Sequence, residues 1–332
     1  MPFRAPENEA PGLELPAEPL AHFEVLLTAL DAGRGWLQDR VALRLAAIAL
    51  LITPGDPGRL AATTRSVAAV LKERLGWFSG VDESVRLVIA AQLVKAGDHP
   101  DVFVDELERI RELFREAGVR RGGVYEVFAA LVLRRVVGGV EALHVERFAQ
   151  IYRAMKKHHW WLTGPEDFPA CAMLVGRPGD PEAMGTGIDE IYRELHDRAG
   201  LARGDALQTA ANLLYLAGVE AATIAGRFAL LVEGFRGAGV SVGRDDYDEL
   251  AILSFVAQPV EQVVATVTEL KGQLRERLRW LGKGPALSLA ASLAFVRLAG
   301  QGTALGTLAD AKLLLDMQAI VTARQAAAVA AT

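Results

Sequence analysis

The feature that most constrains this chain is a turn residue that returns about every 41 positions, each time at the end of a short, alanine-rich apolar run. Neighbouring turn residues lie 38 to 42 positions apart. Spacing this regular over a long chain is typical of stacked helix pairs, in which each pair buries its apolar side against the next. The turn residues are Gly55, Gly97, Gly138, Gly176, Gly218, Pro259 and Gly300.

Each unit reads as a longer amphipathic outer helix, a turn, and a shorter inner helix that is apolar almost all round. In the second unit, this pattern predicts an outer helix over residues 60–75 and an inner helix over residues 85–94. No segment alternates apolar and polar residues as a strand does. We therefore expect an all-α fold, an α-solenoid or curled superhelix of about seven helix hairpins, built like HEAT or armadillo arrays. It either curves openly or closes on itself.

Three short segments also recur at a larger interval. LKERL, KAG and FREAGV, which begin at positions 71, 95 and 114, have counterparts YRELH, LAG and FRGAGV that begin 121 positions later. This interval spans about three units, which indicates that larger blocks were copied together.

The ends of the chain differ from its repeating part. Residues 1–20 are rich in proline and glutamate and lack the apolar core of a secretory signal, so we expect a disordered tail. Residues 21–332 then form a single helical-repeat array with a C-terminal capping helix over residues 305–326.

Composition bounds the compartment and the partners. The single cysteine, Cys171, allows no intrachain disulfide and is typical of a cytoplasmic protein. The apolar runs at 44–52 and 286–296 fall short of the roughly 20 residues that span a membrane. The net charge of −5 argues against broad binding to a phosphate backbone.

Aromatic and acidic residues gather at the turns between outer and inner helices. Tryptophans there either plug the open end of a helix pair or form an aromatic edge that binds a partner. Carboxylates at the start of a helix are typical caps of its free N–H groups. The tryptophans are Trp36, Trp77, Trp160, Trp161 and Trp280, and the acidic residues are Asp82, Glu83, Glu166, Asp167, Asp205, Asp245, Asp246 and Asp248.

The densest polar and aromatic stretch runs over residues 155–169 and is the first place to look for a site. His158 or His159 beside Glu166 or Asp167 would form an acid–base pair. The two histidines are adjacent and point about 100° apart on a helix, so they do not chelate one ion as an i, i+4 pair does. We expect no metal and no cofactor, and Cys171 is expected to be a buried, inert thiol.

Basic residues offer a third kind of surface. Two arginine clusters are interspersed with glutamates, which favours a solvated helix face over a nucleic-acid stripe. Arg44 and Arg86 each lie eleven positions before the turn residue of their unit, on otherwise apolar inner helices. They would form a ladder that binds an anionic ligand or pairs with carboxylates. The clusters are Arg109, Arg111, Arg115, Arg120, Arg121, Arg134 and Arg135, and Arg275, Arg277 and Arg279.

The segment from residue 151 to 218 contains IYRAMKKHHWWLTGPEDFPACAMLV and IDEIYRELHDRAGLARGDALQTAANLLYLAG. It resembles the uncharacterised bacterial family known as domain of unknown function 4003. The resemblance implies an all-helical bacterial cytoplasmic protein and carries over no activity and no catalytic residues.

These observations favour a noncatalytic binding scaffold, with a protein or peptide as the first expected partner and a small ligand as the second. The candidate binding residues are His158, His159, Trp160, Trp161, Glu166, Asp167, Trp77, Arg44 and Arg86. An enzyme with its site at the turn over residues 158–167 is the alternative, and a nucleic-acid-binding repeat ranks third.

Overall fold

The protein was examined as a computed structural model, which describes residues 16–32, 40–75, 80–158, 163–278 and 283–298. Over these ranges the secondary structure consists of 14 α-helices and short 3₁₀ turns, without strands. The expectation of an all-α fold is confirmed.

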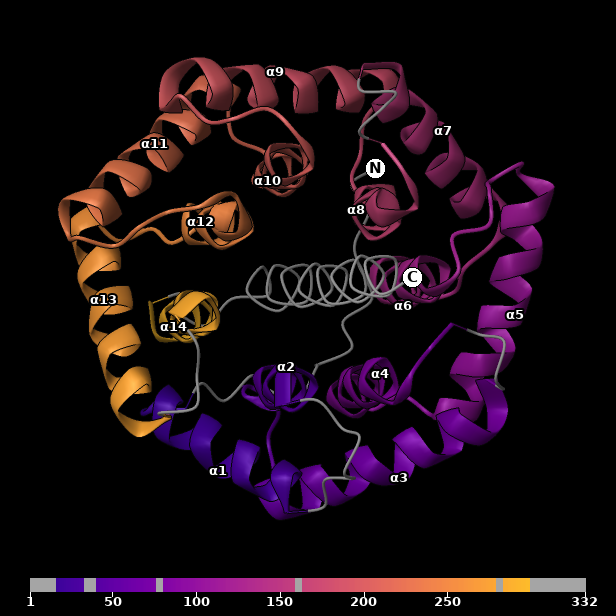
Figure 1. Ribbon diagram of the computed structural model, residues 1–332. Helices are drawn as coiled ribbons and strands as arrows, with labels where there is room; N and C mark the ends of the chain where they lie inside the picture. Colours follow the sequence, from indigo (N-terminus) through magenta and orange to yellow (C-terminus); the bar gives the residue numbers. More distant parts are fainter. Residues whose placement is uncertain (1–15, 33–39, 76–79, 159–162, 279–282, 299–332) are drawn as a thin grey trace, which may run out of the picture.

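The helices form two concentric rings (Figure 1). Odd-numbered helices make the outer ring and even-numbered helices make the inner ring, so that each outer helix is followed along the chain by an inner one. The outer helices are α1 (Pro19–Asp31), α3 (Pro57–Leu75), α5 (Pro100–Glu116), α7 (Ala142–His158), α9 (Pro181–Ala199), α11 (Ala221–Gly237) and α13 (Val260–Arg277). The inner helices are α2 (Arg40–Leu50), α4 (Glu83–Ala96), α6 (Val124–Val137), α8 (Phe168–Val175), α10 (Asp205–Tyr215), α12 (Tyr247–Leu253) and α14 (Lys283–Leu298).

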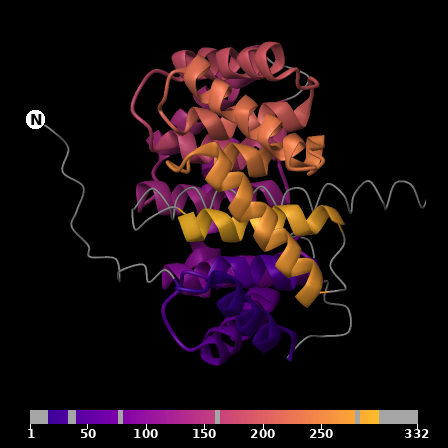
Figure 2. The same cartoon turned by 90° about the vertical axis from the view of Figure 1, so that its left-hand side faces the viewer.

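The array closes on itself, which answers the question that the sequence left open. Helix α14 contacts α1, and Arg277 at the end of α13 pairs with Glu24 of α1 at 3.1 Å. From the side, α13 and α14 lie between the first helices of the chain and the later ones (Figure 2). First and last units are therefore neighbours.

Burial follows the apolar pattern of each helix. In α5 the buried residues recur at helical spacing, as Phe103, Leu107, Ile110 and Phe114, and the other side meets solvent. In α4 every residue from Ser84 to Leu93 is buried except Arg86. The core therefore lies between the two rings, and the buried faces of the outer helices and most of each inner helix form it.

Helices α5 and α11, whose sequences match at an interval of 121, end in the same way. Gly118 and Gly239 take positive φ angles of 72° and 73°, which favour glycine. The N–H of Val119 donates to Phe114 O at 2.9 Å, and the N–H of Val240 donates to Phe235 O at 2.8 Å. The recurring segment therefore ends both helices with the same glycine conformation and the same hydrogen bond.

The chain ends differ in detail from expectation. Helix α1 begins at Pro19, inside the predicted tail, because proline at the first helical position is pre-organised for the helix and lacks only an N–H that has no partner there. Residues 1–15 and the predicted capping helix over 305–326 lie outside the described residues.

Candidate functional site

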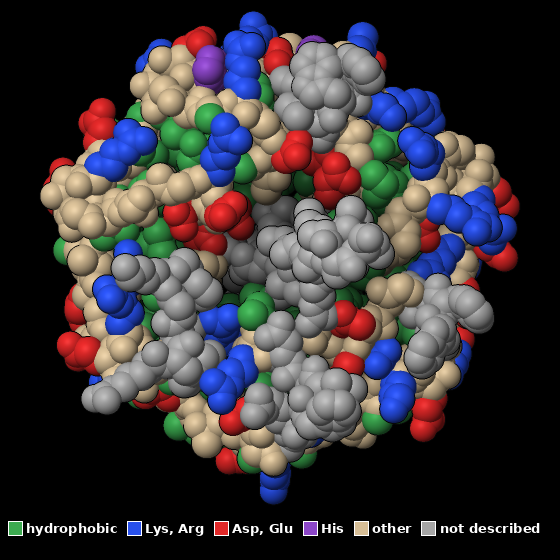
Figure 3. Space-filling view, viewed as in Figure 1, with side chains coloured by type: hydrophobic (Ala, Val, Ile, Leu, Met, Phe, Trp, Pro, Cys, Tyr) green, Lys and Arg blue, Asp and Glu red, His purple; other side chains and the backbone are tan. Residues whose placement is uncertain are grey.

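All inner helices begin at one end of the ring, the end toward the viewer in Figure 1. Carboxylates occupy the first turns of α4, α6, α10 and α12 and the 3₁₀ turn before α8. In the space-filling view, acidic side chains gather toward the centre of this end, over α8, α10 and α12 (Figure 3). We call this surface the acidic face. Its exposed residues include Asp82, Glu83, Glu166, Asp205 and Asp245.

Several of these turns use a carboxylate to bind free N–H groups. Asp82 accepts from the N–H of Val85 at 2.9 Å, at the start of α4. In the 3₁₀ turns η2 (Pro165–Asp167) and η3 (Arg244–Asp246), the third residue reaches back to the glycine before the turn. Asp167 Oδ2 accepts from the N–H of Gly164 at 3.1 Å, and Asp246 Oδ2 accepts from the N–H of Gly243 at 2.7 Å. These carboxylates cap helix starts, as such residues commonly do.

Asp167 differs from the other caps because it is buried, with 6% of its surface exposed. Burial, and then the charge of Glu166, raise the pKa of Asp167 to about 8. Its Oδ1 accepts from Asn212 Nδ2 at 3.0 Å, and Asn212 Oδ1 accepts from Gln208 Nε2 at 3.0 Å. A buried chain of three polar side chains therefore joins the turn before α8 to α10.

Asn212 and Gln208 were not among the residues that the sequence singled out. They lie four positions apart within the apolar segment of α10, so both face the same side of the helix. The sequence signal that could have identified them is a pair of amide side chains four positions apart on an otherwise apolar inner helix. Beside the chain, Asn212 lines a cavity of about 10 Å³ between α8 and α10, room for about one water molecule.

Aromatic side chains pack around Phe168, the residue that follows Asp167. The ring of Phe168 lies 5.4 Å from the ring of Phe148 and 5.3 Å from that of Tyr152, edge to face in both cases. Burial raises the pKa of Tyr152 to about 12 and holds the pKa of the Cys171 thiol well above its usual value. Cys171 is fully buried and contacts the sulfur of Met155 at 3.4 Å. Both groups stay protonated at neutral pH.

The sequence-predicted residues of the 155–169 stretch have different partners. His158 Nδ1 lies 3.8 Å from Asp189 Oδ2, on the neighbouring outer helix α9, whereas Asp167 bonds to Asn212 on α10. Glu166 is exposed beside Asp167. His159, Trp160 and Trp161 lie outside the described residues, as do Trp77 and the other tryptophans, Trp36 and Trp280.

The two inner-helix arginines lie where the spacing placed them, on α2 and α4. Arg44 is 9% exposed. Arg86 is half-buried, and its guanidinium donates to Val81 O at 2.6 Å, just before its own helix. Arg86 thus fixes the entry to α4.

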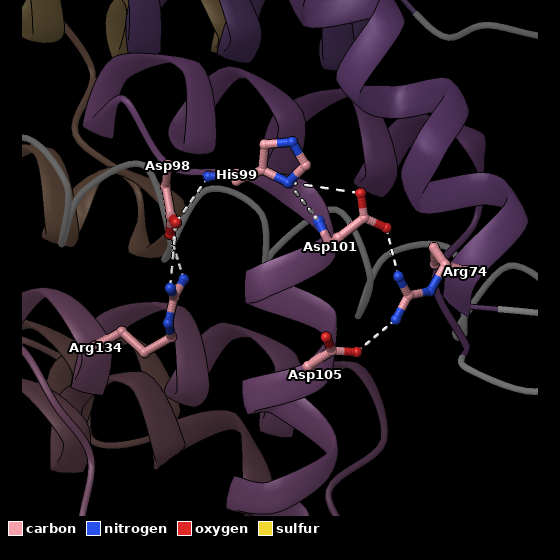
Figure 4. Close-up of polar contacts among 6 residues, drawn as sticks. All are labelled: Arg74, Asp98, His99, Asp101, Asp105 and Arg134. Carbon is pink, nitrogen blue, oxygen red and sulfur yellow. Dashed lines mark hydrogen bonds and ion pairs between the residues drawn. The ribbon is translucent and has the colours of Figure 1, made fainter.

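Most of the clustered arginines are paired within the protein. Arg134 bonds to Asp98 (Figure 4) and to Glu106. Arg74, which lies outside the clusters, bonds in the same way to Asp101 and Asp105 (Figure 4). The remaining contacts are Arg109 with Val140 O, Arg111 with Glu126, Arg115 with Glu112, Arg135 with Gln92, and Arg277 with Glu24; Arg279 lies outside the described residues. Except for Arg115 with Glu112, which both lie on α5, these contacts join different elements of the fold.

Neither a metal centre nor a membrane span emerges from the described residues. Their histidine, cysteine and carboxylate side chains form no group of three or more arranged to hold a metal ion. None of the described helices combines the length and apolarity needed to cross a bilayer. Chemically, the acidic face offers hydrogen-bond acceptors and negative charge.

Three comparisons with known proteins gave one match. Neither the search of curated proteins nor the search of solved structures gave a match. A family model described as "Protein of unknown function (DUF4003)" matches residues 57–326, from the first residue of α3 onward. The match covers most of the chain, and the protein therefore belongs to the DUF4003 family.

Proposed function

We propose that this protein is a noncatalytic binding scaffold that holds a positively charged segment of another protein on its acidic face. The observation that carries the proposal is the recurrence of exposed carboxylates at the starts of four inner helices, α4, α8, α10 and α12, all at one end of the ring. Complementary charge speeds encounter with a partner and selects against acidic ones.

The alternatives have less support among the described residues. Most of the clustered arginines are engaged in internal pairs, which reduces the positive charge available to a nucleic-acid backbone. His158 pairs with Asp189, so it does not serve Asp167 as an acid–base partner in this arrangement. A scaffold requires neither feature.

The proposal includes the repeat architecture and the compartment. The helix pairs form a HEAT- or armadillo-like array in which every unit contributes one inner-helix start to the binding end, supported by the period near 41 and the shared helix stop at Gly118 and Gly239. The single cysteine, Cys171, supports a cytoplasmic location.

A binding assay with charge-matched peptides tests this function. Fluorescently labelled peptides of equal length, one set rich in lysine and arginine and one rich in aspartate and glutamate, are titrated with the full chain. We expect saturable binding of basic peptides only, with an affinity that falls as salt is raised. Equal binding of both sets, or of neither, contradicts the proposal.

A matched pair of variants locates the surface. The first, Glu83→Gln with Asp205→Asn and Asp245→Asn, neutralises three exposed carboxylates of the acidic face. The control, Glu108→Gln with Glu190→Gln and Glu261→Gln, removes the same charge from exposed positions on α5, α9 and α13. Loss of binding in the first variant alone places the peptide on the acidic face, and equal loss in both refutes that placement.

A further inference from the structure

We infer that residues 305–326 form a helix along the axis of the ring and pack against the sides of the inner helices that face this axis. The inference goes beyond the proposed function, because it concerns the middle of the ring and not the acidic face. The occupant is part of the chain itself, the segment that follows the last inner helix, α14.

The closed ring leaves no outer position for a helix after α14. Along the chain each inner helix is followed by an outer helix, so the next helix after α14 would be an outer one (Figure 1). That position is taken by α1, which contacts α14 and whose Glu24 pairs with Arg277 at the end of α13. A helix that follows α14 therefore lies either on the surface of the two rings or at their axis.

The sequence of residues 305–326 favours the axis. Leu313, Leu314 and Leu315 are consecutive, so on a helix they point about 100° apart and cover its whole circumference. A helix that is apolar all round is buried on every side, whereas an outer helix such as α5 keeps one side in solvent. The axis, which the inner helices surround, offers burial on every side.

The side of α2 that faces the axis is apolar and only partly buried. The most deeply buried residues of α2 include Leu43, Ala46 and Leu50, which share one side of the helix and face the core between the rings. Val41 and Ile48 lie on the opposite side, about two turns apart, and both are half-buried. Helix α2 therefore presents an apolar surface toward the axis.

Helix α10, across the ring from α2, presents a similar side (Figure 1). The ring of Tyr215 packs against Gly187 of the outer helix α9, which marks the outward side of α10. Leu213 lies two positions earlier and so about 200° around the helix, on the side that faces the axis. Leu213 and Thr209 also line the cavity between α10 and Met173 of α8. Apolar side chains thus face the axis from opposite sides of the ring.

The segment is long enough to run along the inner helices over their full extent. As a helix, residues 305–326 would extend about 33 Å, whereas α14, with 16 residues, extends about 24 Å. Residues 299–304 connect the two and include Gly300 and Gly302, which permit a reversal of the chain. The chain can therefore return from the end of α14 through the middle of the ring.

Photochemical cross-linking of the full chain tests this position. Leu315→benzoylphenylalanine places a photoreactive ring in the middle of the segment. The control is the same replacement at Leu230, a 55% exposed leucine of the outer helix α11. Each variant is mixed with heavy-isotope-labelled unaltered protein, irradiated and analysed by mass spectrometry. We expect the Leu315 variant to cross-link to inner helices of its own chain, and the control to give no product with them.

The other outcomes overturn the inference. Products with outer helices alone place the segment on the surface, products that join the two isotope labels place it on a second copy, and the absence of products leaves it in solvent. Circular dichroism before irradiation shows whether each variant is folded.

Hydrogen exchange of the unaltered protein tests the inference without any substitution. We expect the amides of residues 305–326 to exchange at least roughly a hundredfold more slowly than those of the same segment as a free peptide. Exchange at the rate of the peptide overturns the inference. Neither measurement involves a basic peptide, so the inference can fail while the proposed scaffold function stands.

Discussion

The side-chain amide of Asn212 donates to the carboxyl group of Asp167 across 3.0 Å and so joins α10 to the turn before α8, 45 residues earlier. This contact is buried, and it places the one strongly shifted carboxyl group of the acidic face between two units.

Asp167 should make stability depend on pH. Its folded pKa is about 8, whereas its ordinary value is 3.8, so the folded protein keeps a proton that the unfolded chain releases between these values. The contribution of Asp167 to stability is therefore full at low pH and declines as pH rises from about 4 to about 8, by at most roughly 1.4 kcal/mol per pH unit. Urea unfolding of the unaltered protein and of Asp167→Asn over pH 5–9 measures it. Other groups cancel in the comparison, and equal pH slopes would falsify this assignment.

Arg147 and Arg227 should be sensitive to replacement by lysine. Arg147 on α7 donates to the backbone oxygens of Val175, Arg177 and Gly179, after α8, and Arg227 on α11 does the same for the segment after α12. Lysine keeps the charge but loses the planar fork, so we expect each change to cost about 1–3 kcal/mol.

Chemical denaturation checks this, with Arg153→Lys as the control because Arg153 is an exposed residue of the same helix α7. A loss as large in the control as in Arg147→Lys would show that the fork contacts contribute nothing specific.

Replacing glycine by alanine at Gly226 within α11 and at Gly239 just after it should change the stability of the protein in opposite directions. Gly239→Ala forces a side chain into a φ of 73° and should cost about 1–2 kcal/mol. Gly226→Ala, in the same helix and with open space around the added methyl group, should stabilise the protein by about 0.5–1 kcal/mol. The melting temperatures of the two variants show whether each change stabilises or destabilises the protein. A higher melting temperature for Gly239→Ala would contradict the prediction.

The two arginines of Figure 4 should differ in importance because they differ in burial. The side chain of Arg134 is 11% exposed and that of Arg74 is 38% exposed, although each bonds to two carboxylates. Removing one partner of a buried pair costs about 3–5 kcal/mol, and an exposed pair contributes about 0–1 kcal/mol.

We therefore expect Arg134→Ala to destabilise strongly and Arg74→Ala hardly at all, as measured by urea unfolding. The pKa of both guanidinium groups is raised, that of Arg74 through bonds to Asp105 and Asp101 and that of Arg134 through bonds to Asp98 and Glu106 despite its burial. A comparable loss in the two variants would mean that burial does not separate them.

The sequence predicted helices well because the apolar pattern is local. Residues 60–75 and 85–94, expected as a pair, correspond to α3 and α4; α3 begins three residues earlier and ends at the predicted residue, and α4 extends two residues further at each end. Closure of the ring was not predictable, because the contact between Arg277 and Glu24 depends on a small angle summed over all units. The partners of His158 and Asp167 were missed for a related reason: Asp189 and Asn212 belong to other helices, and spacing along one segment does not specify contacts between units.

The chain of Asp167, Asn212 and Gln208 has two possible directions of hydrogen bonding. When Asp167 is ionised, both amides donate toward it, and the free end of the chain at Gln208 is an oxygen, as found here. When Asp167 Oδ1 carries a proton, that proton is donated to Asn212, both amides turn over, and the free end becomes an N–H group. One proton at Asp167 thus reverses the polarity presented at Gln208, two side chains away, without movement of a helix.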